Sequence, residues 1–131
     1  MSRKIILGGG LMSLAIAALH VFGGGPEFHV PALQSPLEPA WKAGFSTIWH
    51  QVTAFLVLNG VFLIAASRAA QFNRELVFLI ILQNTAFGLL FLTYGWVRLG
   101  NPFILLQWIL FLPLAFLLWL GLLRDSSGKP N

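Results

Sequence analysis

Residues 45–66 read FSTIWHQVTAFLVLNGVFLIAA, a run of 22 residues without a charged side chain. An α-helix rises about 1.5 Å per residue, so a run of this length matches the hydrocarbon core of a bilayer, which is about 30 Å thick. We therefore expect a membrane-spanning helix here, with His50 near its leading end and Asn59 near its middle.

Three further apolar runs, at residues 5–22, 76–97 and 103–123, predict an all-α fold with four spans in one domain over residues 1–131. The first run follows Arg3 and Lys4, as the apolar part of a signal peptide does. It continues past the cleavage-like motif Ala15-Ile16-Ala17, so we expect it to be retained as a helix.

The composition points to lipid as the solvent of this chain. Of its 131 residues, 57% are hydrophobic and 9% are charged, whereas a soluble domain is about one quarter charged. The chain has no cysteine, which excludes disulfides, thiolate metal sites and thiol redox chemistry. Its net charge of +4 comes from scattered residues rather than from a basic stripe, so we expect no nucleic-acid partner.

The longest connection is expected between the first two spans, over residues 23–44. Gly23-Gly24-Gly25-Pro26 predicts the end of the first helix, and three further prolines (Pro31, Pro36 and Pro39) favour an irregular segment. We expect a long outer loop that caps the bundle. Residues 124–131 are expected to form a disordered tail.

The short links over residues 67–75 and 98–102 predict antiparallel neighbours in an up-down four-helix bundle. In that arrangement, one side of the membrane receives six basic residues, namely Arg3, Lys4, Arg68, Arg74, Arg124 and Lys129, and the other receives Lys42 and Arg98. The positive-inside rule then predicts cytoplasmic N and C termini. We expect a bacterial inner-membrane protein whose 23–44 loop faces the periplasm.

All three histidines are expected near the outer end of the first two spans. The pattern His20-x₆-Glu27-x-His29-x₂₀-His50 could supply three imidazoles and a carboxylate to zinc, copper or iron. Alternatively, His20 and His50 could be the axial ligands of a b-type haem. The competing interpretation is structural, with each ring hydrogen-bonded near a helix end and no metal bound.

A second set of polar residues could line an outward-facing cleft together with His50. Its members are Thr53, Asn84, Tyr94, Arg98 and Gln107, with Arg98 placed to hold an anionic group of a quinone or a lipid. The competing interpretation is that amides in the spans bond from one helix to another. Asn59 lies nine residues after His50, on the opposite face of an α-helix, so it cannot line the same cleft.

The sequence therefore favours a small polytopic membrane subunit with an outward-facing His/Glu site for a transition metal or haem b, within a larger membrane redox assembly. Its expected partners are the lipid bilayer and other membrane subunits or further copies of itself. Two alternatives stay open: a purely structural or assembly subunit, and a stand-alone enzyme or carrier for a lipophilic substrate such as a quinone or a lipid.

Overall fold

The computed structural model describes residues 2–126, and this part of the chain is helical with short connections. The elements are α1 (Ser2–Leu19), the π-helix η1 (His20–His29), α2 (Val30–Gln34), α3 (Pro39–Arg68), α4 (Arg74–Leu99), the 3₁₀-helix η2 (Pro102–Ile104) and α5 (Trp108–Ser126). Four helical segments are long and apolar enough to cross a membrane, namely Ser2–Gln34, Pro39–Arg68, Arg74–Leu99 and Trp108–Asp125. The prediction of an all-α membrane protein with four candidate spans is confirmed.

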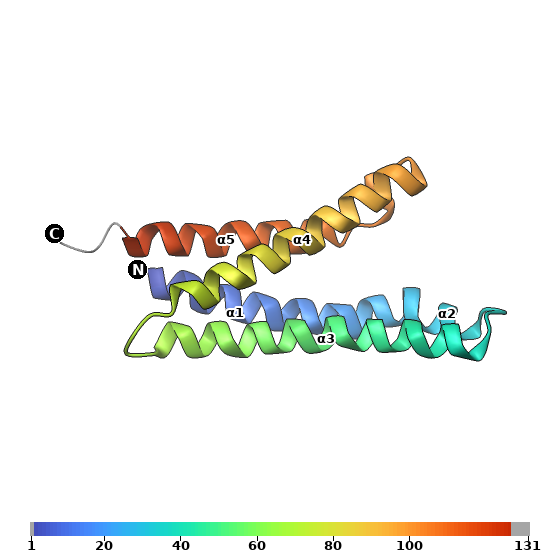
Figure 1. Cartoon of the computed structure of the whole chain (residues 1–131), viewed down its shortest axis with the longest axis horizontal. Helices are drawn as coiled ribbons and strands as arrows, with labels where there is room; N and C mark the ends of the chain where they lie inside the picture. The colour runs from blue at the N-terminus through green and yellow to red at the C-terminus, as the bar shows by residue number, and fades with distance from the viewer. Residues whose placement is uncertain (1, 127–131) are drawn as a thin grey trace.

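Figure 1 shows each long helix running opposite to the one before it, so that the start of α1 and the end of α5 lie together. We call this the terminal end, and the opposite end, which carries His20, His29 and His50, the histidine end. Helix α1 packs against α3 and α5, and α4 packs mainly against α5. Helices α3 and α4 make few contacts with each other, and α4 diverges from α3 toward the histidine end (Figure 1).

Small residues allow α1 to lie close to its two neighbours. A Cβ atom added at Gly10 would lie 2.9 Å from the carbonyl oxygen of Gly60 on α3. The hydroxyl of Ser13, which is fully buried, donates to the carbonyl of Leu56 at 2.8 Å. On the other side of α1, a Cβ at Gly9 would lie 2.5 Å from Leu118 of α5. These contacts make α1 the central helix of the fold.

The structure corrects the expected long loop over residues 23–44. Helix continues from Ser2 to Gln34, and only Ser35–Glu38 separate it from α3. Gly23-Gly24-Gly25-Pro26 lies inside η1, where the bonding shifts to the pattern i→i−5, as in the bond from Val30 N–H to the carbonyl of Gly25. A wider turn relieves the clash between a proline ring and the preceding turn, and glycine accepts the altered backbone at little cost.

The fourth span begins later than residue 103. Residues 102–104 form η2, and α5 begins at Trp108, because side chains hold the link in a turn. The Asn101 side chain accepts from the N–H of Phe103 at 2.9 Å, and the indole of Trp108 donates to the carbonyl of Pro102 at 3.0 Å. At the other end, α5 continues to Ser126, so residues 124–126 are helical rather than part of a disordered tail; residues 127–131 lie outside the described residues.

The close contact between Gly10 and Gly60 predicts that two alanine substitutions on α1 differ strongly in their effect on the free energy of unfolding. Gly10→Ala should lower the free energy of unfolding by about 1–3 kcal/mol, because its Cβ must push α1 away from α3. Gly8→Ala is the matched control, since a Cβ there meets nothing within 4 Å and alanine favours helix. Thermal unfolding in detergent, followed by circular dichroism, measures both; equal midpoints would contradict the close approach.

Candidate functional site

The structure brings the three histidines together: His20 and His29 lie against the indole of Trp49 on α3, and His50 lies against His29. The His20 ring stacks on Trp49 with centroids 3.9 Å apart and an interplanar angle of 20°. The His29 ring lies nearly parallel to the same indole, with centroids 5.4 Å apart. His50 meets His29 edge to face, with centroids 5.3 Å apart. Residues 20, 29 and 50 thus form one cluster at the contact between η1 and α3.

The π-helical geometry of η1 explains why His20 and His29 share a face. In an α-helix, two residues nine positions apart point in opposite directions, because each residue turns by about 100°. A π-helix closes its bonds one residue later, and two of its wider turns take about nine residues. His20 and His29 are the first and last residues of η1, so both side chains reach α3.

Hydrogen bonds fix the orientation of two of the rings. Nε2 of His20 lies 3.1 Å from the carbonyl oxygen of Trp49, and since a carbonyl can only accept, this nitrogen carries a proton. Nε2 of His29 lies 2.8 Å from the hydroxyl oxygen of Ser46. Both rings are half-buried, whereas His50 is exposed. Nδ1 of His20 and Nδ1 of His29 are therefore the nitrogens left for other partners.

Glu27 lies on η1 but is exposed, and no described residue bonds to its carboxylate. Within residues 2–126, no group of three or more His, Asp or Glu side chains is arranged as a metal site. In the cluster, Nε2 of His20 and Nε2 of His29 point to two different protein partners, the carbonyl of Trp49 and the hydroxyl of Ser46.

The residues of the expected polar cleft lie in several environments. The hydroxyl of Thr53 donates back to the carbonyl of Trp49 at 3.3 Å, and Asn84, only 1% exposed, donates to the carbonyl of Ile80 in its own helix. Tyr94 and Arg98 are exposed on α4. Gln107 is half-buried in the link before α5, and its Oε1, like Oδ1 of Asn84, has no bonding partner in the described chain.

One amide pair links α3 and α4, which make few contacts with each other. Nδ2 of Asn59 on α3 donates to Oε1 of Gln83 on α4 at 3.0 Å. This contact fits the expectation that amides within the spans bond between helices. Asn84 and Thr85 instead bond to carbonyls one turn earlier in α4.

A cavity of about 350 Å³ lies where α4 diverges from α3. Val52 of α3, Leu105 of the link and four residues of α4, Phe87, Leu90, Phe91 and Tyr94, line it. Its wall is almost wholly apolar, and Tyr94 is the one residue of the expected cleft that lines it.

Two residues of the cluster, Trp49 and Ser46, were not among the residues expected at a site. Both lie on the face of α3 that also carries Phe45 and His50, and their spacings of three and four residues give the signal from which they could have been found. Glycine also contributes to this contact, because a Cβ at Gly24 would lie 3.0 Å from the Trp49 ring.

No family model, no curated protein and no solved structure matches this chain.

Stacking on Trp49 predicts that this ring holds η1 against α3. Trp49→Leu should destabilise the histidine end by about 1–3 kcal/mol, because each aromatic pair contributes about 0.5–1.5 kcal/mol. Hydrogen exchange of the amides in residues 20–34 measures the effect. Trp41→Leu on the same helix is the control, since Trp41 is 71% exposed. The same exchange rates in both variants would mean that the indole does not hold η1 in place.

Proposed function

We propose that this chain is a small polytopic membrane subunit that binds a transition-metal ion at its histidine end. The supporting observation is that His20 and His29 stack on the indole of Trp49 and that His50 lies against His29, so three imidazoles form one cluster. Zinc, copper and iron all accept neutral imidazole as a ligand.

The hydrogen bonds suit this function, because histidines that bind metals usually donate their second N–H to a carbonyl or a similar group. His20 already donates from Nε2 to the carbonyl of Trp49, which leaves Nδ1 for the ion. The Ser46 hydroxyl, 2.8 Å from Nε2 of His29, can accept a hydrogen bond in the same way, and Nδ1 of His29 then faces the ion. His50 is exposed, and in the proposed bound state its side chain turns toward the other two rings. Exposed Glu27 adds negative charge nearby and is an outer ligand or a partner of one.

A metal ion has more support than haem b at this position. The Nε2 of His20, the usual nitrogen for haem iron, donates to the carbonyl of Trp49 and is already engaged.

The distribution of charge supports the proposed orientation. The terminal end carries Arg3, Lys4, Arg68, Arg74 and Arg124, whereas Lys42 and Arg98 lie toward the histidine end. By the positive-inside rule, the terminal end faces the cytoplasm and the histidine cluster faces the periplasm of a bacterial inner membrane. The proposed partners are other membrane subunits of a redox assembly or further copies of this chain.

Metal binding is tested by titrating the detergent-purified protein with Zn²⁺ or Cu²⁺ and by measuring the bound metal. We expect about one ion per chain, and the double substitution His20→Ala, His50→Ala should abolish binding. Ser46→Ala should weaken it about 10–100-fold, because the hydroxyl holds His29 in place. Thr47→Ala is the control, since that hydroxyl bonds to the carbonyl of Ala43 in its own helix.

Metal retained by the double variant would exclude these histidines as ligands. A wild-type protein that binds no metal beyond the level of the double variant would favour the structural or assembly subunit instead.

The 350 Å³ cavity favours a second function, the binding of a lipophilic molecule such as a quinone. Leu90→Trp should fill the cavity and reduce the retention of a ubiquinone analogue in detergent at least fivefold. Leu89→Trp is the control, because Leu89 does not line the cavity. Its side chain is 50% exposed, close to the 55% of Leu90. Equal retention by both variants would exclude this site.

A further inference from the structure

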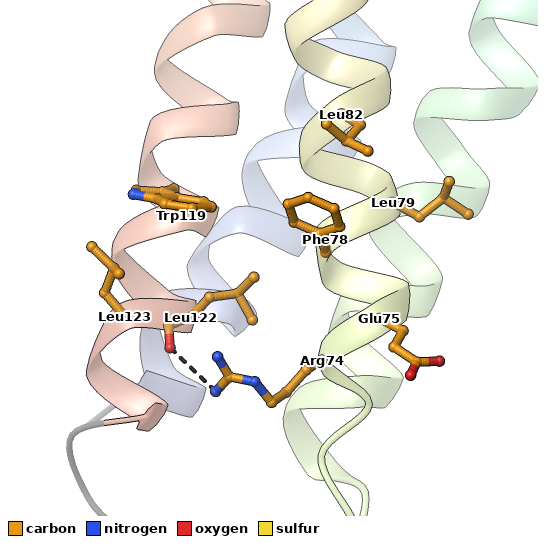
Figure 2. A pocket seen from close by; sticks show the side chains of 8 residues that line it. All are labelled: Arg74, Glu75, Phe78, Leu79, Leu82, Trp119, Leu122 and Leu123. Carbon is orange, nitrogen blue, oxygen red and sulfur yellow. Dashed lines mark hydrogen bonds between the residues drawn. The ribbon is translucent and has the colours of Figure 1, made fainter.

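A groove of about 420 Å³ lies between α4 and α5 at the terminal end, far from the histidine cluster. Figure 2 shows Phe78 of α4 and Trp119 of α5 facing each other across it, with Leu82 deeper along α4. Arg74 and Glu75 lie at its mouth, at the start of α4. The groove is thus apolar along its length and charged at one end.

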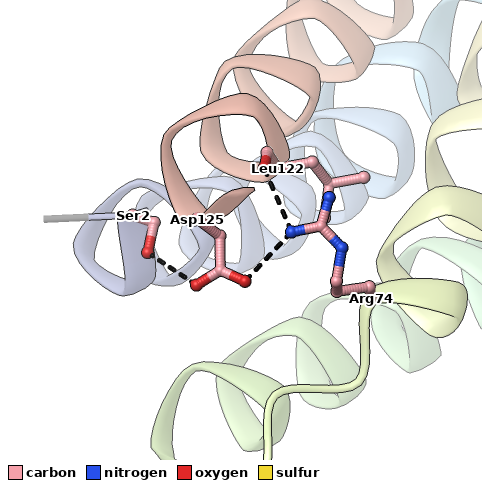
Figure 3. A network of polar contacts seen from close by, with 4 residues as sticks. All are labelled: Ser2, Arg74, Leu122 and Asp125. Carbon is pink, nitrogen blue, oxygen red and sulfur yellow. Dashed lines mark hydrogen bonds and ion pairs between the residues drawn. The ribbon is translucent and has the colours of Figure 1, made fainter. Parts of the chain in front are cut away.

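The guanidinium of Arg74 closes the end of the groove and joins α4 to α5. Its Nη1 donates to the carbonyl of Leu122 at 3.3 Å and to Oδ2 of Asp125 at 3.1 Å, and Ser2 of α1 donates to the other carboxylate oxygen (Figure 3). The Arg74 side chain nevertheless remains 44% exposed. No described residue accepts a hydrogen bond from its Nη2 or Nε, so these donors can serve a further acceptor at the exposed part of the side chain.

The terminal end as a whole carries an excess of positive charge. Among the described residues it holds five basic side chains, Arg3, Lys4, Arg68, Arg74 and Arg124, against the two acidic side chains Glu75 and Asp125. The other end holds Lys42 and Arg98 against Glu27 and Glu38, which balance. A positive excess next to a lipid-facing groove is complementary to an anionic headgroup.

We propose that this groove binds an anionic phospholipid of the bilayer leaflet at the terminal end. Its acyl chain lies between Phe78 and Trp119 and continues along Leu82. Its phosphate accepts hydrogen bonds from Nη2 and Nε of Arg74. The planar guanidinium matches a phosphate in a paired geometry, and an indole is favoured at the level of the lipid headgroups.

Asp125 should lower the affinity of this groove for a lipid phosphate. The carboxylate holds Nη1 of Arg74 and offsets part of its charge, so it competes with the phosphate for the same guanidinium. Removing this negative charge should strengthen lipid binding, whereas removing Arg74 should weaken it. A site made only by the apolar groove would respond to neither change.

The test is native mass spectrometry of the detergent-purified protein with added phosphatidylglycerol or with phosphatidylcholine of the same acyl chains. We expect phosphatidylglycerol to be retained at least fivefold better than phosphatidylcholine. Arg74→Gln should lower this preference about fivefold, which is the effect of one basic residue near an anionic surface. Asp125→Asn should increase the retention of phosphatidylglycerol. Leu82→Trp, which fills the groove, should reduce the retention of both lipids. Inorganic phosphate at millimolar concentration should not displace the lipid.

Arg68→Gln is the matched control, because Arg68 is exposed at the same end but does not line the groove. Equal retention of the two lipids would overturn the proposal, as would equal effects of Arg74→Gln and Arg68→Gln. Displacement by inorganic phosphate would show an anion site without a lipid. If Arg74→Gln fails to fold, the gain from Asp125→Asn and the loss from Leu82→Trp decide the question.

Discussion

The close approach of α1 to α3 is the contact on which the rest of this structure depends. Gly10 and Gly60 bring two backbones together, and the buried hydroxyl of Ser13 donates across the same contact to Leu56. In lipid, burial of apolar surface gives helices little reason to associate, so close packing and interhelical hydrogen bonds must hold them together. On its other side, α1 meets α5 at two glycines. Gly9 of α1 lies against Leu118 of α5, and Gly121 of α5 lies against Ile6 of α1. A chain without these small residues could form the same four helices and leave them unassembled.

The histidine cluster follows from the same contact. Because α1 continues without interruption into η1, the close alignment of α1 with α3 extends to Trp49, where His20 and His29 stack. The wider turns of η1 then decide which side chains face α3. An α-helix over the same residues would turn His29 away from His20, and the three imidazoles would not meet.

The four spans could be predicted from sequence because they depend on length and apolar composition alone. The run at residues 45–66 lies inside α3, and the run at residues 76–97 lies inside α4. The errors occur where glycine and proline allow more than one backbone geometry. Gly23-Gly24-Gly25-Pro26 indicates the end of an α-helix, yet it forms part of a π-helix. Similarly, the apolar residues 103–106 could not reveal that Asn101 and Trp108 hold this segment in a turn.

For the site, the sequence predicted that three histidines share one end, since His20 and His50 lie near the ends of two spans and His29 lies in the segment that joins them. It could not predict Trp49 as the partner of His20 and His29, because that contact requires the π-helical spacing of these two residues. The polar cleft was harder still. Asn84 and Thr53 carry polar groups that could face another helix, but both bond to carbonyls of their own helix. Within residues 2–126, the side-chain hydrogen bond that joins α3 to α4 is that of Asn59 with Gln83.

The divergence of α4 from α3 also determines how a molecule would reach the cavity beside Phe87. Its lining residues belong to α3, to α4 and to the link before α5, and α3 and α4 are both long and apolar enough to cross a membrane. The two helices diverge toward the histidine end (Figure 1). An occupant would enter sideways, from among the acyl chains, without passing through the aqueous phase. Its partition coefficient, rather than its solubility in water, would therefore set the concentration that the protein encounters.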